Sequence, residues 1–185
     1  MNKRGFRVLG MLSFLFTILL MSSFAGAFYE ANWGSTKDMI KQDQKDILVA
    51  ETDEFLAYIG TLFDKQIQKV YLFTEEGLDS ILYTFTEVPE ELKDYIYNYQ
   101  DVNKELEAIL GKPLFADESW GDERFKNLPE LALALGDLRY STVWIKDDVI
   151  THIVYANDLN IYHVIFINPF DDILGENNLS SKIEP

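Results

Sequence analysis

The chain of 185 residues contains no cysteine. Disulfides, metal sites built from cysteine and membrane attachment through an acylated cysteine are therefore excluded. Without such cross-links the folded state must be stabilised by a hydrophobic core, and the chain is long enough to form one.

Basic residues are scarce. The chain has 16 lysine and arginine residues against 31 aspartate and glutamate residues, which gives a formal net charge of −15 at pH 7. Nucleic acids and anionic lipid headgroups are bound mainly through basic residues, so we expect neither as a partner. The sequence leaves cationic molecules and divalent ions open as partners. An acidic surface by itself serves solubility more commonly than catalysis.

Several motifs that carry chemistry are also missing. The chain has no G-x-S-x-G elbow, phosphate-binding glycine pattern, helical metalloprotease pair or calcium loop of the D-x-[DN]-x-[DN]-G type. Ser35, in the segment Trp33-Gly34-Ser35, is interpreted as a helix cap instead of a nucleophile. We therefore expect no cofactor, and the sequence assigns no catalytic residue; enzymatic activity is left open, with a non-catalytic role preferred.

The first 27 residues have the pattern of a signal peptide. Three basic residues precede the apolar run Val8–Met21, and Ala25-Gly26-Ala27 then supplies the small residues that a signal peptidase cuts. That run of 14 residues covers roughly 21 Å, against about 30 Å for a hydrocarbon core. Cleavage at Ala27, with Ala25 and Ala27 as the small residues of the recognised pattern, is preferred to a retained anchor, and we expect export to the periplasm or the exterior without a stable membrane anchor.

Residues 28–170 are predicted to form a single α+β domain, followed by a polar tail at 171–185. Helical periodicity predicts one long amphipathic helix over 90–110, with Gly111 and Pro113 ending it. Shorter helices are predicted over 36–45 and 129–135, with Met39 and Ile40 as inward contacts of the first. The predicted antiparallel sheet has five or six strands and carries the long helix on one face. Its candidate strands are 55–63, 70–73, 78–85, 140–145, 149–155 and 159–167.

The segments WGSTKDMI, LGKP and YLFTEEGLDSILYTF, with the closing strands, resemble small exported bacterial proteins of uncharacterised function that begin with a Trp-Gly-x-Ser helix cap. More remotely, the plan of a helix followed by a hairpin resembles beta-lactamase inhibitory protein and the small lipoproteins of outer-membrane assembly. The resemblance covers most of residues 30–168 and implies a binding or assembly role without catalytic residues. The absent cysteine separates this chain from the lipoproteins.

His152 and His163 are the first candidate site. If Asn157-Asp158 forms a two-residue turn, residues 152 and 163 face each other on one side of the sheet, with Cβ atoms ~5 Å apart. Two imidazoles at that distance can hold a metal ion or act as a pH switch. Accidental register is the simpler interpretation, because a zinc site needs a third ligand. A one-residue change in the turn would separate the two residues.

The second candidate site is acidic and surrounds Trp120. Asp117, Glu118, Asp122 and Glu123 lie in the segment 114–127, which we expect to be irregular. A pair of carboxylates beside an aromatic ring suits carbohydrate binding or glycoside hydrolysis. A solvated loop held by the packing of Trp120 explains the same residues.

The function predicted from sequence is an exported, non-catalytic binding or assembly protein whose partner is an exported or envelope protein. The alternatives are a hydrolase of envelope or extracellular polymers that uses the carboxylates near Trp120, and a metal or pH sensor based on His152 and His163.

Overall fold

The computed structural model describes residue 29 and residues 32–170, and its helices and strands all belong to one unit that begins at Trp33. The predicted signal peptide, with Ala25 and Ala27, lies outside the described residues, as does the predicted tail 171–185. Within the described ranges, every helix is too short or too polar to cross a membrane.

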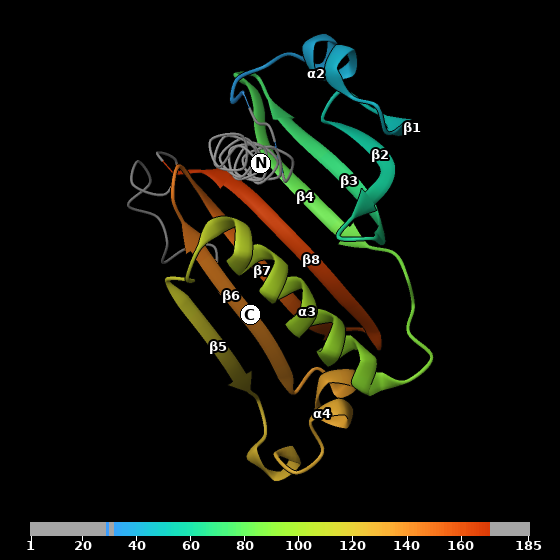
Figure 1. Ribbon diagram of the computed structural model, residues 1–185. Coiled ribbons are helices and arrows are strands. Elements are labelled where there is room, and N and C mark those ends of the chain that lie inside the picture. Colours follow the sequence, from blue (N-terminus) through green and yellow to red (C-terminus); the bar gives the residue numbers. More distant parts are fainter. Residues whose placement is uncertain (1–28, 30–31, 171–185) are drawn as a thin grey trace, which may run out of the picture. The chain divides into compact units, whose positions relative to one another are not determined.

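Eight strands form one antiparallel sheet in the order β1-β2-β3-β4-β8-β7-β6-β5 (Figure 1). The order is symmetric about the central pair β4 and β8, because each half of the chain contributes four strands that follow one another across the sheet. The strands are β1 Ile47–Glu51, β2 Phe55–Leu62, β3 Lys65–Thr74, β4 Gly77–Phe85, β5 Phe115–Trp120, β6 Leu138–Ile145, β7 Asp148–Asn157 and β8 Asn160–Pro169.

The predicted fold class was wrong. The sheet has eight strands instead of five or six, and three α-helices belong to the described part of the chain. The two strands that the prediction missed, β1 and β5, are the two edges of the sheet. The side chains of an edge strand have neighbours on one side only and are therefore more exposed, and in β1 and β5 they lack the regular alternation of apolar residues that identifies an inner strand. All five residues of β1 are exposed, and β5 replaces part of the segment expected to be irregular.

The helices are α2 Lys37–Asp43, α3 Leu92–Leu110 and α4 Pro129–Leu135, with a short 3-10 helix at Glu123–Phe125. The cap of α2 was assigned to the wrong residue: Thr36, not Ser35, accepts a hydrogen bond from the amide of Met39. Ser35 is buried, and its carbonyl accepts from the amide of Leu78. Ile40 is buried as expected, whereas Met39 is exposed.

Both α3 and α4 pack on the same face of the sheet. In Figure 1, α3 lies across β7 and its neighbours, and α4 lies at one end of these strands. Ile96 and Tyr99 of α3 and Leu133 of α4 form one buried cluster with Tyr140 and Val154 of the sheet. We call this side the His152 face, after a β7 residue beneath α3. Its opposite is the Phe166 face, because side chains alternate between the two sides along a strand.

Candidate functional site

The structure brings His152 and His163 together, although not in the predicted register. Asn157 pairs with Asn160, so the turn consists of Asp158 and Leu159, both with positive φ. Val154 therefore faces His163, and His152 faces Ile165. The turn lies one position further along the chain than predicted. That shift moves every pairing by two residues, and a shift of two keeps both histidines on the same face.

The two histidines form a buried hydrogen-bonded pair. Their Nε2 atoms are 2.6 Å apart, and their ring centroids are 4.9 Å apart. Each ring is also stacked on an aromatic neighbour, His163 on Phe85 at 4.0 Å and His152 on Tyr99 at 4.5 Å. The pair is thus enclosed between the sheet and α3.

Asn103 extends this pair into a network. Its Oδ1 lies 2.7 Å from Nδ1 of His152, and its Nδ2 donates to the hydroxyl of Thr142 at 3.2 Å. The hydroxyls of Thr142 and Tyr99 share a further hydrogen bond of 2.6 Å. Polar groups from α3, β6, β7 and β8 therefore satisfy one another inside the core, as buried polar groups must.

Burial keeps both imidazoles neutral. Desolvation lowers the pKa of His163 to about 3, and the nearby ammonium of Lys65 acts in the same direction. Desolvation also lowers the pKa of His152 well below its usual value of 6.5, with a smaller contribution from His163. Burial similarly raises the pKa of Tyr99, although its hydrogen bond to Thr142 opposes the shift.

Within the described residues, no third His, Cys, Asp or Glu lies close enough to complete a metal site with the pair. The side chains that surround the histidines are instead Asn103, Thr142 and two aromatic rings. An asparagine and a hydroxyl are poor substitutes for the nitrogen and sulfur ligands of zinc. The residues observed here fit a hydrogen-bonded core network better than they fit a metal centre.

The predicted acidic site is divided between the two faces of the sheet. Asp117 and Glu118 are consecutive residues of β5, so their side chains point to opposite sides. Asp117 accepts a hydrogen bond of 2.6 Å from the hydroxyl of Ser119, and Glu118 is exposed. Trp120 packs against the cluster beneath α3 and α4, which agrees with a structural role.

Asp122 is occupied by Arg124. Its Oδ1 caps the 3-10 helix by accepting from the backbone amide of Arg124 at 2.9 Å, and both carboxylate oxygens accept from the guanidinium. Hydrogen bonds from the side chain and then the backbone of Arg124 lower the pKa of Asp122. This carboxylate is ionised and paired, and it does not converge with Asp117 or Glu118 on a common point.

No family model, curated protein or solved structure matched the chain. The resemblance drawn from its short motifs therefore stays a prediction.

The apolar surface of the Phe166 face was not among the candidate sites predicted from sequence. One row of directly paired residues crosses the whole sheet on this side, and it contains no charged residue: Ala50, Ala57, Val70, Leu82, Phe166, Thr151, Val143 and Phe115. The adjacent row has one charge, at its β5 end: Ile47, Ile59, Gln68, Thr84, Val164, Ile153, Ser141 and Asp117.

Many side chains on this face are partly accessible to solvent. Val70, Leu82, Val143, Ile153 and Phe166 are half-buried, whereas Ala57 and Val164 in the same two rows are buried. Tyr155 and Tyr162 stack on each other at 5.3 Å, and Tyr162 is exposed. The sequence signal for this surface was the apolar character of the strands at both odd and even positions, which indicated two faces that avoid water.

Proposed function

We propose that this chain is an exported, non-catalytic binding or assembly protein of the bacterial envelope or exterior, and that it binds a protein partner through the Phe166 face. The observation that carries the proposal is the uncharged row that crosses all eight strands, from Ala50 to Phe115. The chain as a whole is 25% charged, whereas this row carries no charge.

The composition of this face supports a protein partner. The centres of protein interfaces are depleted of charged residues and enriched in aromatic residues, and their rims are polar. The Phe166 face has the same arrangement, because apolar and hydroxyl side chains form its middle rows while Asp117 and Arg139 lie near its β5 and β6 margin. The partner that fits it is a protein with an uncharged, apolar or aromatic surface.

The carboxylates near Trp120 do not favour the hydrolase alternative. Glycoside hydrolysis needs two carboxyl groups on either side of one bond, about 5–10 Å apart. Asp117 and Glu118 point to opposite sides of β5, and Asp122 is held by Arg124. A binding role requires no such pair, and it agrees with the role that the resemblance to inhibitory and assembly proteins implies.

The proposal is tested by photo-crosslinking in cells that produce the protein. Benzoylphenylalanine replaces Tyr162 on the Phe166 face or, as the matched control, Tyr97 on the outward side of α3. Both are exposed tyrosines, at 36% and 55%, so the two variants differ mainly in the face that they sample. We expect irradiation of the Tyr162 variant to yield one predominant crosslinked protein that the Tyr97 variant does not yield.

Equal crosslinking from both positions, or none from Tyr162 while Tyr97 crosslinks, would contradict the proposal. The melting temperature of each variant confirms that it is folded before crosslinks are compared.

A further inference from the structure

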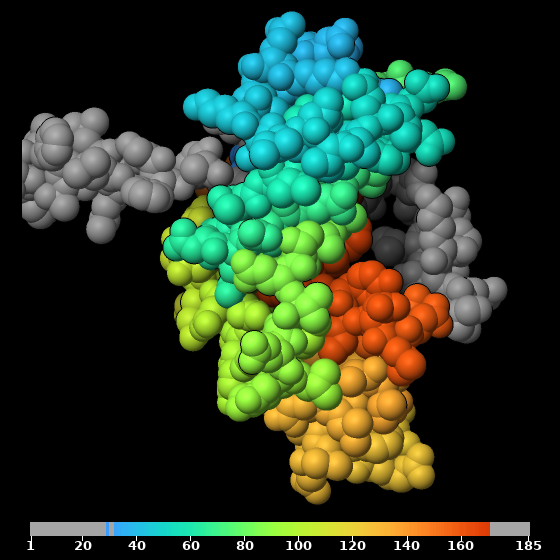
Figure 2. Space-filling view, turned by 90° about the vertical axis from the view of Figure 1, so that its right-hand side faces the viewer, coloured from blue at the N-terminus to red at the C-terminus, as the bar shows by residue number. Residues whose placement is uncertain are grey.

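The edge strand β1 presents apolar side chains to solvent. Ile47, Leu48 and Val49 are all exposed, and Ile47 is 71% accessible. In the part of the chain that the structure describes, β1 pairs with β2 alone, so one side of its backbone lacks a neighbouring strand. Figure 2 looks onto this side of the sheet, where the cyan residues of β1 and β2 lie at the surface. Unpaired backbone groups at such an edge are a template for another strand.

The other edge of the sheet is different. β5 carries the adjacent carboxylates Asp117 and Glu118, and charged side chains on an edge strand oppose the addition of a further strand. The residues Ile47 to Ala50 include neither a charge nor a proline. The chain therefore protects one edge of its sheet with charge and leaves the other apolar.

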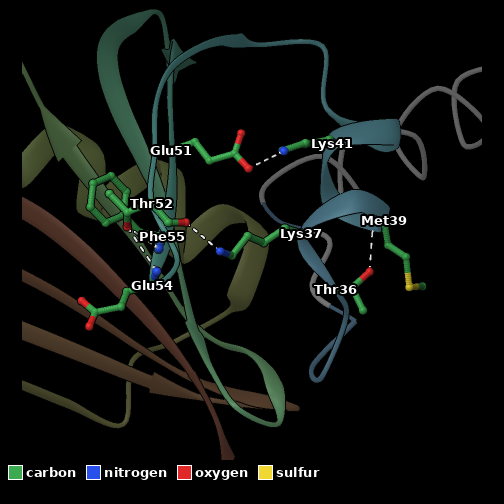
Figure 3. Close-up of polar contacts among 8 residues, drawn as sticks. All are labelled: Thr36, Lys37, Met39, Lys41, Glu51, Thr52, Glu54 and Phe55. Carbon is green, nitrogen blue, oxygen red and sulfur yellow. Dashed lines mark hydrogen bonds and ion pairs between the residues drawn. The ribbon is translucent and has the colours of Figure 1, made fainter.

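Contacts from α2 hold β1 at its carboxyl end, as Figure 3 shows. Lys41 forms an ion pair with Glu51, and Lys37 donates to the carbonyl of Thr52 at 2.6 Å. The hydroxyl of Thr52 accepts from the amides of Glu54 and Phe55, both at 3.2 Å, and closes the turn into β2. These contacts join the carboxyl end of β1 to α2 and to the turn into β2, which favours a preformed edge for a partner.

The surroundings of β1 are acidic. The segment 37–54 contains six carboxylates and three lysines. Glu51 is paired with Lys41, and Asp46 is paired with Lys69 at 3.1 Å. The four other carboxylates are all exposed: Asp38, Asp43, Asp53 and Glu54. A cationic segment is attracted to this edge, whereas an anionic one is repelled.

We propose that β1 binds an extended segment of a partner protein by strand addition, and that this segment alternates apolar with basic residues. The inference rests on the proposed binding function and names the mode of binding at the margin of the same sheet. Backbone hydrogen bonds to β1 supply affinity, and the exposed Ile47, Leu48 and Val49 select apolar side chains in the ligand.

A second copy of the chain is a poorer occupant. Two chains of net charge −15 repel each other. The β1–β2 pairing also shifts register between Leu48 and Ala50, a bulge that increases the local twist of the edge. A short flexible segment can follow a twisted edge more readily than the edge of a second rigid sheet can.

The test measures binding of a fluorescent, capped octapeptide, Lys-Val-Thr-Val-Lys-Val-Thr-Lys, to the full chain by anisotropy at low ionic strength. We expect binding that weakens at least tenfold in the Val49→Lys variant. The matched control is Val88→Lys, the same substitution at a residue that is 81% exposed in the connection between β4 and α3. We expect this control to bind as the wild type does.

Two ligand controls separate strand addition from simple charge attraction. A peptide with glutamate in place of lysine is expected not to bind, and a peptide with proline in place of its second valine is expected to bind at least tenfold more weakly. Amide exchange of residues 47–51 should slow in the complex with the original peptide.

The inference is overturned if the wild type does not bind the peptide, if Val49→Lys and Val88→Lys bind equally, or if the proline peptide binds as well as the original. It is also overturned if the free chain sediments as a dimer that Val49→Lys dissociates, because the occupant is then a second copy.

Crosslinking from Tyr162 together with absent peptide binding would reject strand addition and retain the proposed binding function, whereas loss of both would reject the two together.

Discussion

His152 and His163 meet through their Nε2 atoms, 2.6 Å apart, although neither residue lies directly opposite the other across β7 and β8. Only one of the two nitrogens can carry the shared proton while both rings are neutral. Asn103 determines which one, because its Oδ1 accepts from Nδ1 of His152 and leaves Nε2 of that ring as an acceptor.

The first prediction concerns these tautomers. At pH 7 we expect His152 to carry its proton on Nδ1 and His163 to carry its proton on Nε2. Two-bond ¹⁵N–¹H correlation spectra of the imidazoles distinguish the two forms directly. A spectrum in which His152 is protonated on Nε2 would mean that the network runs in the opposite direction, with Asn103 donating to His152.

The second prediction is a loss of stability in acid. The folded-state pKa values of both histidines lie below the unfolded value, so their contribution is complete above pH 6.5 and declines as the pH falls. A neutral buried His163 contributes a slope that rises from about 1 kcal/mol per pH unit at pH 6 to about 1.3 kcal/mol per pH unit at pH 4.5, because its pKa is 6.5 in the unfolded chain and about 3 in the folded one. Because carboxylates contribute equally to wild type and variant, His163→Gln should reduce the measured slope of the unfolding free energy by about that amount. Identical slopes in urea denaturation series of the two proteins would argue against burial of a neutral His163.

The third prediction compares two buried hydroxyls. Among the described residues, the hydroxyl of Tyr58 has no hydrogen-bond partner, whereas that of Tyr99 is bonded to Thr142. Removal of an unsatisfied buried hydroxyl relieves its desolvation cost, so Tyr58→Phe should stabilise the fold or leave it unchanged. Tyr99→Phe should destabilise it by about 1 kcal/mol. Urea denaturation of both variants tests this difference, and a greater loss in Tyr58→Phe than in Tyr99→Phe would contradict it.

The fourth prediction compares two glycines with positive φ. Gly77 begins β4, and a Cβ placed on it would lie 2.2 Å from the carbonyl oxygen of Gly34. Gly111 follows α3, and a Cβ there would meet nothing within 4 Å. Gly111→Ala should cost roughly 1–3 kcal/mol from backbone strain alone. Gly77→Ala adds a clash with backbone and should lower the melting temperature further. Equal effects would imply that the segment around Gly34 can move away from β4.

The sequence allowed the six inner strands and α3 to be located, because each has a clear apolar period. It did not reveal β1 and β5, since these two edge strands lack a regular alternation of apolar and polar residues. Apolar periodicity was also insufficient to predict the register of the histidine pair. Alternation predicts which residues share a face, but the turn determines which residues pair directly. The observed turn includes Leu159 at a positive φ, a conformation that favours glycine or asparagine, so leucine gave no signal for it.

Asn103 was missed for a related reason. It follows Val102 at the margin of the apolar stripe of α3, where a polar residue is normally solvated. A polar side chain four residues after the buried Tyr99 was the available signal. Its significance depends on Thr142 and His152, which are distant in the chain and come close only when the sheet forms.

In the proposed function, the Phe166 face binds the partner. This binding is tested by calorimetry with the crosslinked partner, once purified. The affinity of the partner is measured for Tyr162→Glu and for the matched control Tyr97→Glu. A charge introduced into an uncharged interface should weaken binding at least tenfold, or about 1.4 kcal/mol, in Tyr162→Glu and leave Tyr97→Glu unchanged. Equal affinities of the two variants, or a loss confined to Tyr97→Glu, would contradict the account.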